Sequence, residues 1–189
     1  HDFKFKSTWK QAASAIMTTD KFSKHITRSF LLNKIKITIN AVCKGAGMIE
    51  PNMATMLSFI SINVDLKKLL LLKILKKAVN SSFNTISVDG DMSTNDTVML
   101  ISTGENKELN FNANTKILKI LENEIKNVCH DLSKMIIEDG EGATKIIKIT
   151  VHKSYNSLQA KKIAYSLANS NLIKTAMYGA DPNWGRIIA

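Results

Sequence analysis

Arginine is scarce in this sequence of 189 residues. Among its 26 basic residues only Arg28 and Arg186 are arginine, although the formal net charge is +10. Specific recognition of bases and phosphates relies largely on guanidinium groups, and the lysines here are scattered rather than clustered with aromatic residues. The composition therefore argues against a nucleic-acid partner, and a basic binding module stays only as the weakest alternative function.

Long apolar runs are also absent. The longest, LKKLLLLKILKK at 66–77, is broken by lysines well short of the length that crosses a bilayer. The first residues, HDFKFKSTWKQ, lack the apolar centre of a signal peptide. We therefore expect a globular protein with no membrane partner and a cytoplasmic location.

Residues that bind metals or cofactors are few and badly spaced. Cys43 and Cys129 form neither a metal-ligand pair nor a disulfide framework, so we predict buried, reduced thiols. No two of the four histidines are spaced as ligands, and no phosphate-binding glycine motif occurs. The acidic loop 87–96 lacks the ligand alternation of a calcium loop and is better read as a turn in which Asp and Ser cap backbone amides. We predict no metal and no resident cofactor.

Hydrophobic periodicity indicates strands that alternate with long helices, which is typical of a layered α/β domain. Asp65 is the expected N-cap of the second helix. A further helix is expected to begin near 185, after Asp181 and Pro182. Helices are predicted over 8–17, 66–83, 114–137 and 157–170, and strands over 33–42, 55–64, 97–104, 143–153 and 172–179.

Thr55 stands between a glycine-bearing loop, 44–54, and a predicted strand. A hydroxyl needs a base beside it to act as a nucleophile, and no Ser-His-Asp arrangement is evident. A free α-amine, with a pKa of about 7.7 to 8.0, would serve as that base if the chain were cut between Ala54 and Thr55. The alternative is an ordinary loop that enters a strand on a β-branched residue.

Five segments in order, AIMTTD, KGAGMIEPNMATML, VDGDMSTND, DGEGATK and GADPNWGRI, carry a resemblance. The chain resembles the ornithine acetyltransferase or glutamate N-acetyltransferase family, which is bifunctional in arginine biosynthesis. The resemblance implies an N-terminal-nucleophile-like fold with mixed sheets flanked by long helices. It also implies self-cleavage between Ala54 and Thr55, so that 1–54 ends an α chain and 55–189 begins a β chain, both packed as one compact unit.

By the same resemblance, Thr55 is the catalytic nucleophile, and Thr18, Lys44, Thr55 and Glu141 bind substrate. The alternatives without a role in binding are a turn cap for Thr18, a solvated loop lysine for Lys44 and a helix-end carboxylate for Glu141. The implied reaction moves acetyl from N-acetylornithine through Thr55 to glutamate. The implied partners are these two substrates and the α and β chains of a heterotetramer. Some members also take acetyl from acetyl-CoA, a donor that the sequence leaves open.

The resemblance covers the central part of a longer family chain, and we expect this sequence to be truncated at both ends. The family's oxyanion-hole Thr-Gly pair, which precedes MTTD, has no counterpart in it. Neither have the C-terminal Asn and Thr or Ser that complete the family's pocket. Loss of an oxyanion donor typically costs about a hundredfold to a thousandfold in rate. The alternative hypothesis is therefore a truncated or degenerate relative that keeps the fold without turnover.

Overall fold

A four-stranded mixed sheet is the centre of the structure, a computed structural model that describes residues 8–50, 56–91, 96–109, 111 and 115–189. The strand order is β1-β2-β3-β4, with antiparallel pairing from β1 to β3 and parallel pairing of β3 with β4. The predicted α/β class is confirmed. The strands are β1 (Lys24–Leu32), β2 (Ile35–Lys44), β3 (Leu57–Ile62) and β4 (Thr97–Ser102).

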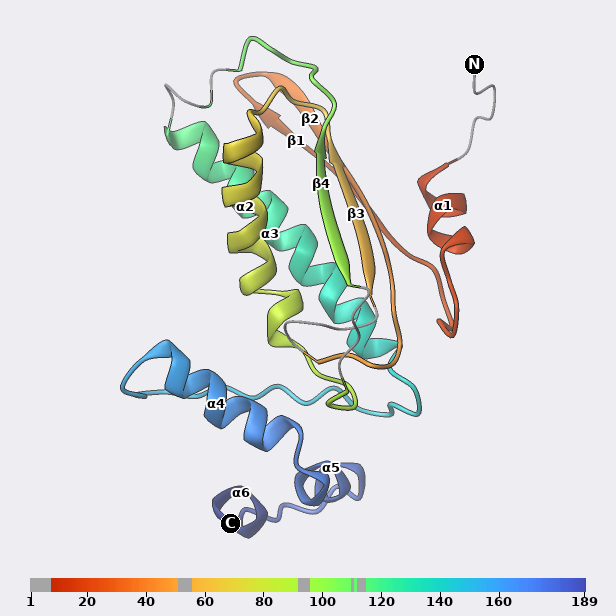
Figure 1. The fold of residues 1–189 in the computed structure, drawn as a ribbon, viewed down its shortest axis with the longest axis vertical. Coiled ribbons are helices and arrows are strands. Elements are labelled where there is room, and N and C mark those ends of the chain that lie inside the picture. The colour runs from red at the N-terminus through yellow and green to blue at the C-terminus, as the bar shows by residue number, and fades with distance from the viewer. Residues whose placement is uncertain (1–7, 51–55, 92–95, 110, 112–114) are drawn as a thin grey trace.

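Helices lie on both sides of this sheet. Figure 1 shows α2 and α3 against one face and α1 beyond the other, with α4 to α6 at one end of the molecule. The helices are α1 (Trp9–Ala15), α2 (Lys68–Asn80), α3 (Thr115–Glu138), α4 (Ser157–Ala168), α5 (Asn171–Tyr178) and α6 (Gly185–Ile188), and a 3₁₀ turn covers Phe83–Thr85.

The core lies between the sheet and α3. Alternate residues of β2, Ile37, Ile39 and Ala41, are completely buried, as the alternating pattern of that segment predicts. The facing side of α3 is apolar at helical spacing, and each aliphatic side chain buried there contributes roughly 1.5 to 3 kcal/mol. The buried residues of α3 are Ile117, Leu121, Ile125, Val128, Cys129, Leu132, Ser133 and Ile136.

Strand β1 was not predicted from the sequence. It pairs with β2 along its whole length, from Lys24 opposite Cys43 to Leu32 opposite Ile35. The two residues between the strands, Asn33 and Lys34, have φ values of 48° and 68°. Positive φ at both positions gives the tight turn whose twist matches an antiparallel hairpin. This hairpin brings the start of β1 beside the end of β2, which is where the candidate site lies.

Two predicted strands do not form. Residues 143–153 form no strand, because the segment runs past α5 rather than along the sheet: Lys145 donates to the carbonyls of Met177 and Tyr178. Residues 172–178 belong to helix α5 instead of a strand, and Gly179 is the C-cap of that helix. The Ser170 hydroxyl caps that helix by accepting from the Ile173 N–H.

Asp65 is not the N-cap of α2. The helix begins at Lys68, and its N-cap residue, Lys67, makes no side-chain cap hydrogen bond. Ile74 and Ala78 of α2 are buried. No helix within the described ranges is long and apolar enough to cross a membrane.

Candidate active site

Two of the predicted substrate residues meet at the end of β2. Lys44 is the last residue of that strand, and its Nζ donates to the Thr18 hydroxyl oxygen at 3.3 Å. The neighbouring Cys43 faces α3, where its thiol contacts the Leu132 carbonyl, so Lys44 lies on the opposite side of the sheet, near α1. Thr18 lies three residues after the end of α1 and is exposed, whereas Lys44 is 8% exposed. A largely buried ammonium held by one hydroxyl has donors left for an anionic ligand.

The loop that follows Lys44 is shaped by backbone contacts to an aspartate. Gly45 has a φ of 143°, a conformation that glycine adopts more readily than other residues. The N–H groups of Met48 and Ile49 donate to the two carboxylate oxygens of Asp89, at 2.6 and 3.0 Å. Asp89 also accepts from the Asp91 N–H, so its predicted role as a turn cap is confirmed. The loop is thereby fixed against residues 88–91.

Glu141 lies against the same loop. Its N–H donates to the Ala46 carbonyl at 3.0 Å, and a Cβ at Gly47 would come within 3.0 Å of its Oε1. Glu141 follows the end of α3 by three residues, and it is exposed. The structure thus brings three predicted substrate residues, Thr18, Lys44 and Glu141, to the loop that begins at Gly45.

The predicted cleavage site, Ala54 and Thr55, lies outside the described residues. The next residue, Met56, is anchored: its N–H donates to Asp96 Oδ1 at 2.7 Å, and its carbonyl accepts from the Thr97 N–H. Burial raises the pKa of Asp96, and the Met56 N–H and the charge of Lys44 oppose that rise. Asp96 ends the motif VDGDMSTND, and from the sequence it was considered only as one of the acidic residues of the loop 87–96, not as an anchor for the residue after the predicted cleavage site.

A buried ion cluster adjoins the site. The Lys24 ammonium contacts Asp20 Oδ1 and Asp139 Oδ2, each at 2.5 Å, and the lysine is completely buried. Burial by itself raises the pKa of Asp20, but hydrogen bonds from the Gly45 N–H, the Lys24 ammonium and the Thr18 N–H outweigh it and hold that pKa below its usual range. Lys24 was not predicted from the sequence as part of the site. The one signal that pointed to it was Asp20, an aspartate four residues before this lysine.

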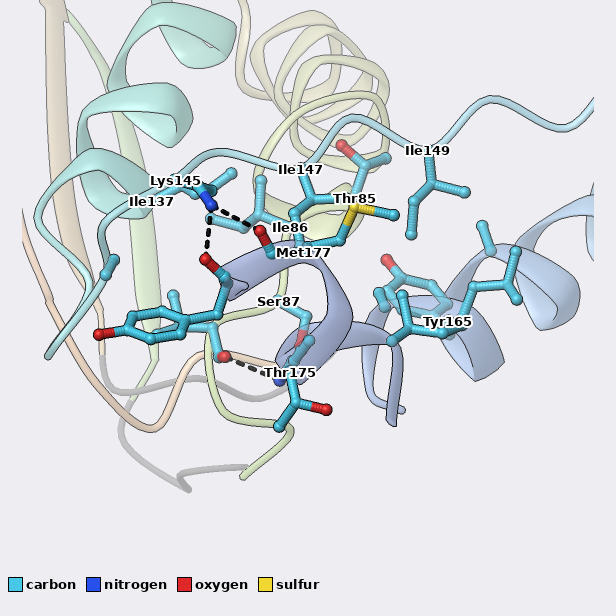
Figure 2. A pocket seen from close by; sticks show the side chains of 18 of the residues that line it. Thr85, Ile86, Ser87, Ile137, Lys145, Ile147, Ile149, Tyr165, Thr175 and Met177 are labelled. Atoms are coloured by element: carbon cyan, nitrogen blue, oxygen red, sulfur yellow. Dashed lines mark hydrogen bonds between the residues drawn. The ribbon is translucent and has the colours of Figure 1, made fainter. Parts of the chain in front are cut away.

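A cavity of about 620 Å³ lies between residues 143–151, α4, α5 and the chain after α2. Figure 2 shows aliphatic side chains such as Ile147 and Ile149 around it, with Lys145 bonded to two carbonyls of α5. Tyr165 closes one side, where burial, with the charge of Glu50 adding to it, raises the pKa of the phenol to about 12. Of the three predicted substrate residues that the structure describes, only Glu141 borders this cavity. It is therefore distinct from the place where Lys44 and Thr18 meet.

Metal and thiol chemistry receive no support from the geometry. In the part of the chain that the structure describes, no group of His, Cys, Asp and Glu could hold a metal ion. Cys43 and Cys129 are free and buried, as predicted. Burial raises the pKa of each thiol to about 12, so both remain protonated at neutral pH and neither is an activated nucleophile.

Comparison with known proteins gives consistent results. The sequence matches the ArgJ family over residues 2–189. It is 45% identical to the mitochondrial arginine biosynthesis bifunctional protein ArgJ of Dictyostelium discoideum, across 97% of this chain and 42% of that protein. It is 46% identical to arginine biosynthesis bifunctional protein ArgJ 1 of Clostridium acetobutylicum, across 97% of this chain and 45% of that protein. The chain thus spans less than half the length of these two relatives.

The crystal structure of the arginine biosynthesis bifunctional protein argJ from Bacillus halodurans has a similar fold. Its TM-score against this chain is 0.57 at 38% sequence identity, and the match covers 69% of this chain and 61% of that one. The layered α/β architecture with a mixed sheet is therefore one that a solved protein of similar sequence also has.

Proposed function

The chain belongs to the ArgJ family, and on that premise we propose that it carries the acetyl-transfer site of an arginine-biosynthesis enzyme. The proposed reaction takes an acetyl group from N-acetylornithine and gives it to glutamate. The products are ornithine and N-acetylglutamate.

One observation carries the proposal. In the antiparallel pairing of β2 with β3, Lys44 stands opposite Leu57. Thr55 precedes Leu57 by two residues, and two residues span at most about 7 Å of chain. This register supports the proposal because the residue two positions after Thr55 pairs with Lys44, whose ammonium contacts Thr18.

The proposed chemistry begins with self-cleavage: the Thr55 hydroxyl attacks the Ala54 carbonyl, the peptide bond becomes an ester, and water hydrolyses that ester. Ala54 then ends in a carboxylate, and Thr55 has a free α-amine. That amine takes the hydroxyl proton as the Thr55 oxygen attacks the acetyl carbonyl of N-acetylornithine. The amide bond of N-acetylornithine breaks, and its nitrogen receives the proton. Ornithine departs, and an acetyl ester remains on Thr55. The amino group of glutamate then attacks the ester carbonyl, and the bond between the acetyl carbon and the Thr55 oxygen breaks. The proton that the amine loses returns to the Thr55 oxygen through the α-amine, and N-acetylglutamate leaves.

Each described residue has a proposed role that matches its chemistry. Lys44 pairs with the α-carboxylate that both substrates share, because a desolvated ammonium favours an anion. Thr18 orients Lys44 and offers its own hydroxyl to the substrate. Glu141, beside the loop and open to solvent, pairs with the side-chain ammonium of ornithine. None of these roles requires a resident cofactor.

The assembly and the compartment are further parts of the proposal. Residues 1–54 and 55–189 would be the parts of an α and a β chain, two of each forming a heterotetramer, which native mass spectrometry would test. We expect the cytoplasm as the location. Two similar relatives, from Dictyostelium discoideum and Candida tropicalis, are named mitochondrial. Imaging of a tagged full-length protein would decide between the two compartments.

An isotope-transfer assay tests the function. The full chain is mixed with N-acetylornithine and ¹⁵N-glutamate, and labelled N-acetylglutamate is the expected product. Thr55→Ala should abolish it, while Thr19→Ala, a change at an exposed threonine next to the site, should not. A folded wild-type chain that forms no labelled product would overturn the proposed transfer.

Two additional arms make the assay more specific. Incubation with N-acetylornithine alone should leave one acetyl group on the peptide that begins at Thr55. Acetyl-CoA in place of N-acetylornithine tests the second donor. Glu141→Gln should weaken use of N-acetylornithine more than use of acetyl-CoA, because acetyl-CoA has no ornithine ammonium. Glu108→Gln, at an exposed glutamate outside the site, is the matched control.

A further inference from the structure

We propose that Lys24 is a positioning residue, whose buried ammonium joins Asp20 to Asp139 and so fixes the three segments that carry the candidate substrate residues. The inference rests on the proposed function for what those segments do. Its structural part, that one lysine sets their relative positions, stands on contacts alone.

The geometry of the cluster is tight. Lys24 opens β1, directly opposite Cys43, and its Nζ contacts one oxygen of each carboxylate at 2.5 Å. All three side chains are 0% exposed. Asp139 follows α3, 115 residues after Lys24. A buried ammonium without these partners would be costly, so each carboxylate is constrained to remain where the lysine is.

Asp20 in turn holds two parts of the site in place through hydrogen bonds. Its Oδ1 accepts from the Gly45 N–H at 2.7 Å, and its Oδ2 accepts from the Thr18 N–H at 3.1 Å. Gly45 is the residue after Lys44. One carboxylate thus holds both the Thr18 turn and the chain next to Lys44, and these two residues contact each other in turn.

Asp139 holds the third part of the site, the segment that carries Glu141. Both of its oxygens accept from the Lys21 N–H at 3.1 Å, which ties the end of α3 to the segment after Asp20. Glu141 follows Asp139 by two residues and is bonded through its N–H to Ala46. The position of Glu141 relative to the site loop therefore depends on where Asp139 is held.

The composition of the cluster favours positioning over stability. It buries two carboxylates against one ammonium, and backbone N–H groups of Thr18, Lys21 and Gly45 meet the excess negative charge. Buried ion pairs usually add little net stability compared with apolar side chains of similar size, whereas they strongly restrict geometry. The ring of Phe22, 5.0 Å from the Lys24 Nζ, closes the apolar side of the cluster.

Amide hydrogen exchange, followed residue by residue by NMR in the full chain, tests the inference without requiring turnover. Two variants are compared with wild type: Lys24→Met, which removes the charge, and Asp20→Asn, which keeps the volume but replaces one acceptor with a donor. We expect exchange of the Thr18 and Gly45 amides to accelerate about tenfold or more in both variants. Asp20→Asn replaces their charged acceptor, and Lys24→Met removes the ammonium that holds that acceptor in place. Exchange at Ile60, in the centre of the sheet, should stay within about twofold in Asp20→Asn. Lys36→Met, at an exposed lysine, should leave all three rates unchanged.

The outcomes separate this inference from the proposed function. Unchanged exchange at Thr18 and Gly45 in folded variants, or acceleration that merely equals that at Ile60, would overturn the positioning role. If Lys24→Met does not fold, the Asp20→Asn data decide by the same criterion. Where wild type transfers acetyl, Asp20→Asn should raise KM for N-acetylornithine about tenfold with a smaller change in kcat; an unchanged KM would contradict the link to substrate. Absence of transfer by wild type counts against the function only, because the exchange rates still decide the structural claim.

Discussion

The ammonium of Lys44 and the hydroxyl of Thr18 are 3.3 Å apart, although 26 residues separate them in the sequence. Lys44 ends a strand in the middle of the sheet, and Thr18 lies in the turn after α1. Their contact places a largely buried positive charge next to an exposed hydroxyl. This arrangement can bind a carboxylate and is the basis of the first prediction.

Substrate affinity should depend on this pair. Lys44→Met is expected to raise KM for both N-acetylornithine and glutamate about tenfold to a hundredfold, since it removes a charge-assisted hydrogen bond to a carboxylate. Thr18→Ala should cost less, about threefold to tenfold, because it removes a neutral hydrogen bond. Steady-state kinetics would measure both effects. Lys36→Met is the control for the lysine, and an equal KM in Lys36→Met and Lys44→Met would contradict the role of Lys44.

Cleavage of the chain should depend on Asp96. Its carboxylate holds the Met56 N–H, one residue beyond the predicted cleavage site. Asp96→Ala removes the acceptor and should slow the appearance of the cleaved chains about tenfold, the scale of one lost hydrogen bond in a buried setting. Asp96→Asn keeps a carbonyl oxygen for that contact and should cleave faster than Asp96→Ala. Equal cleavage rates in the two variants, followed by gel electrophoresis, would show that this contact is irrelevant.

The elements that could be predicted from the sequence are those whose packing against a neighbouring element requires regularly spaced apolar residues. From Lys36 to Ala41, β2 alternates buried residues with less buried ones, and α3 has an apolar stripe, so both were found close to their observed limits. β1 was missed because it opens with a buried lysine and its alternation is weak. The segment 143–153 has a strand-like pattern but no partner strand, and α5 is decided by the Ser170 cap and by burial of Ile173.

The site was predictable in part for the same reason. Motif resemblance identified Thr18, Lys44 and Glu141, and the structure brings these three to one loop. Their common dependence on Lys24 was not visible, since an isolated lysine in a basic chain is normally solvated. Only the tertiary pairing of β1 with β2, and the end of α3 beside them, shows that Lys24 is buried between two carboxylates.

Acid should destabilise the fold through Asp20. Its pKa is below the usual value of 3.8 in the folded chain, so its ionised form adds stability that is present above about pH 4 and is lost as pH falls through the lowered pKa. Urea unfolding at several pH values should show the free energy of unfolding falling below about pH 4. Asp20→Asn should flatten this dependence, and Asp65→Asn, at an exposed aspartate, should not. A slope that Asp20→Asn leaves unchanged would refute the assignment.

Thiol reactivity should report folding. Cys43 and Cys129 are buried, and burial raises the pKa of each to about 12. At pH 8 a disulfide reagent such as dithionitrobenzoate should therefore leave both thiols unmodified in the native chain and modify both in denaturant. Thr103→Cys, which adds a thiol at an exposed position, should react at once and serves as the positive control. Rapid native reaction of the wild-type chain would contradict the burial of these side chains.

The intact mass of the purified chain tests whether Thr55 becomes the first residue of a new chain. Self-cleavage gives two pieces of 54 and 135 residues, because the cut falls after residue 54 of 189. Thr55→Ala should remain one species of 21.0 kDa. A folded wild-type protein that also stays a single 21.0 kDa species would contradict the self-cleavage of this chain.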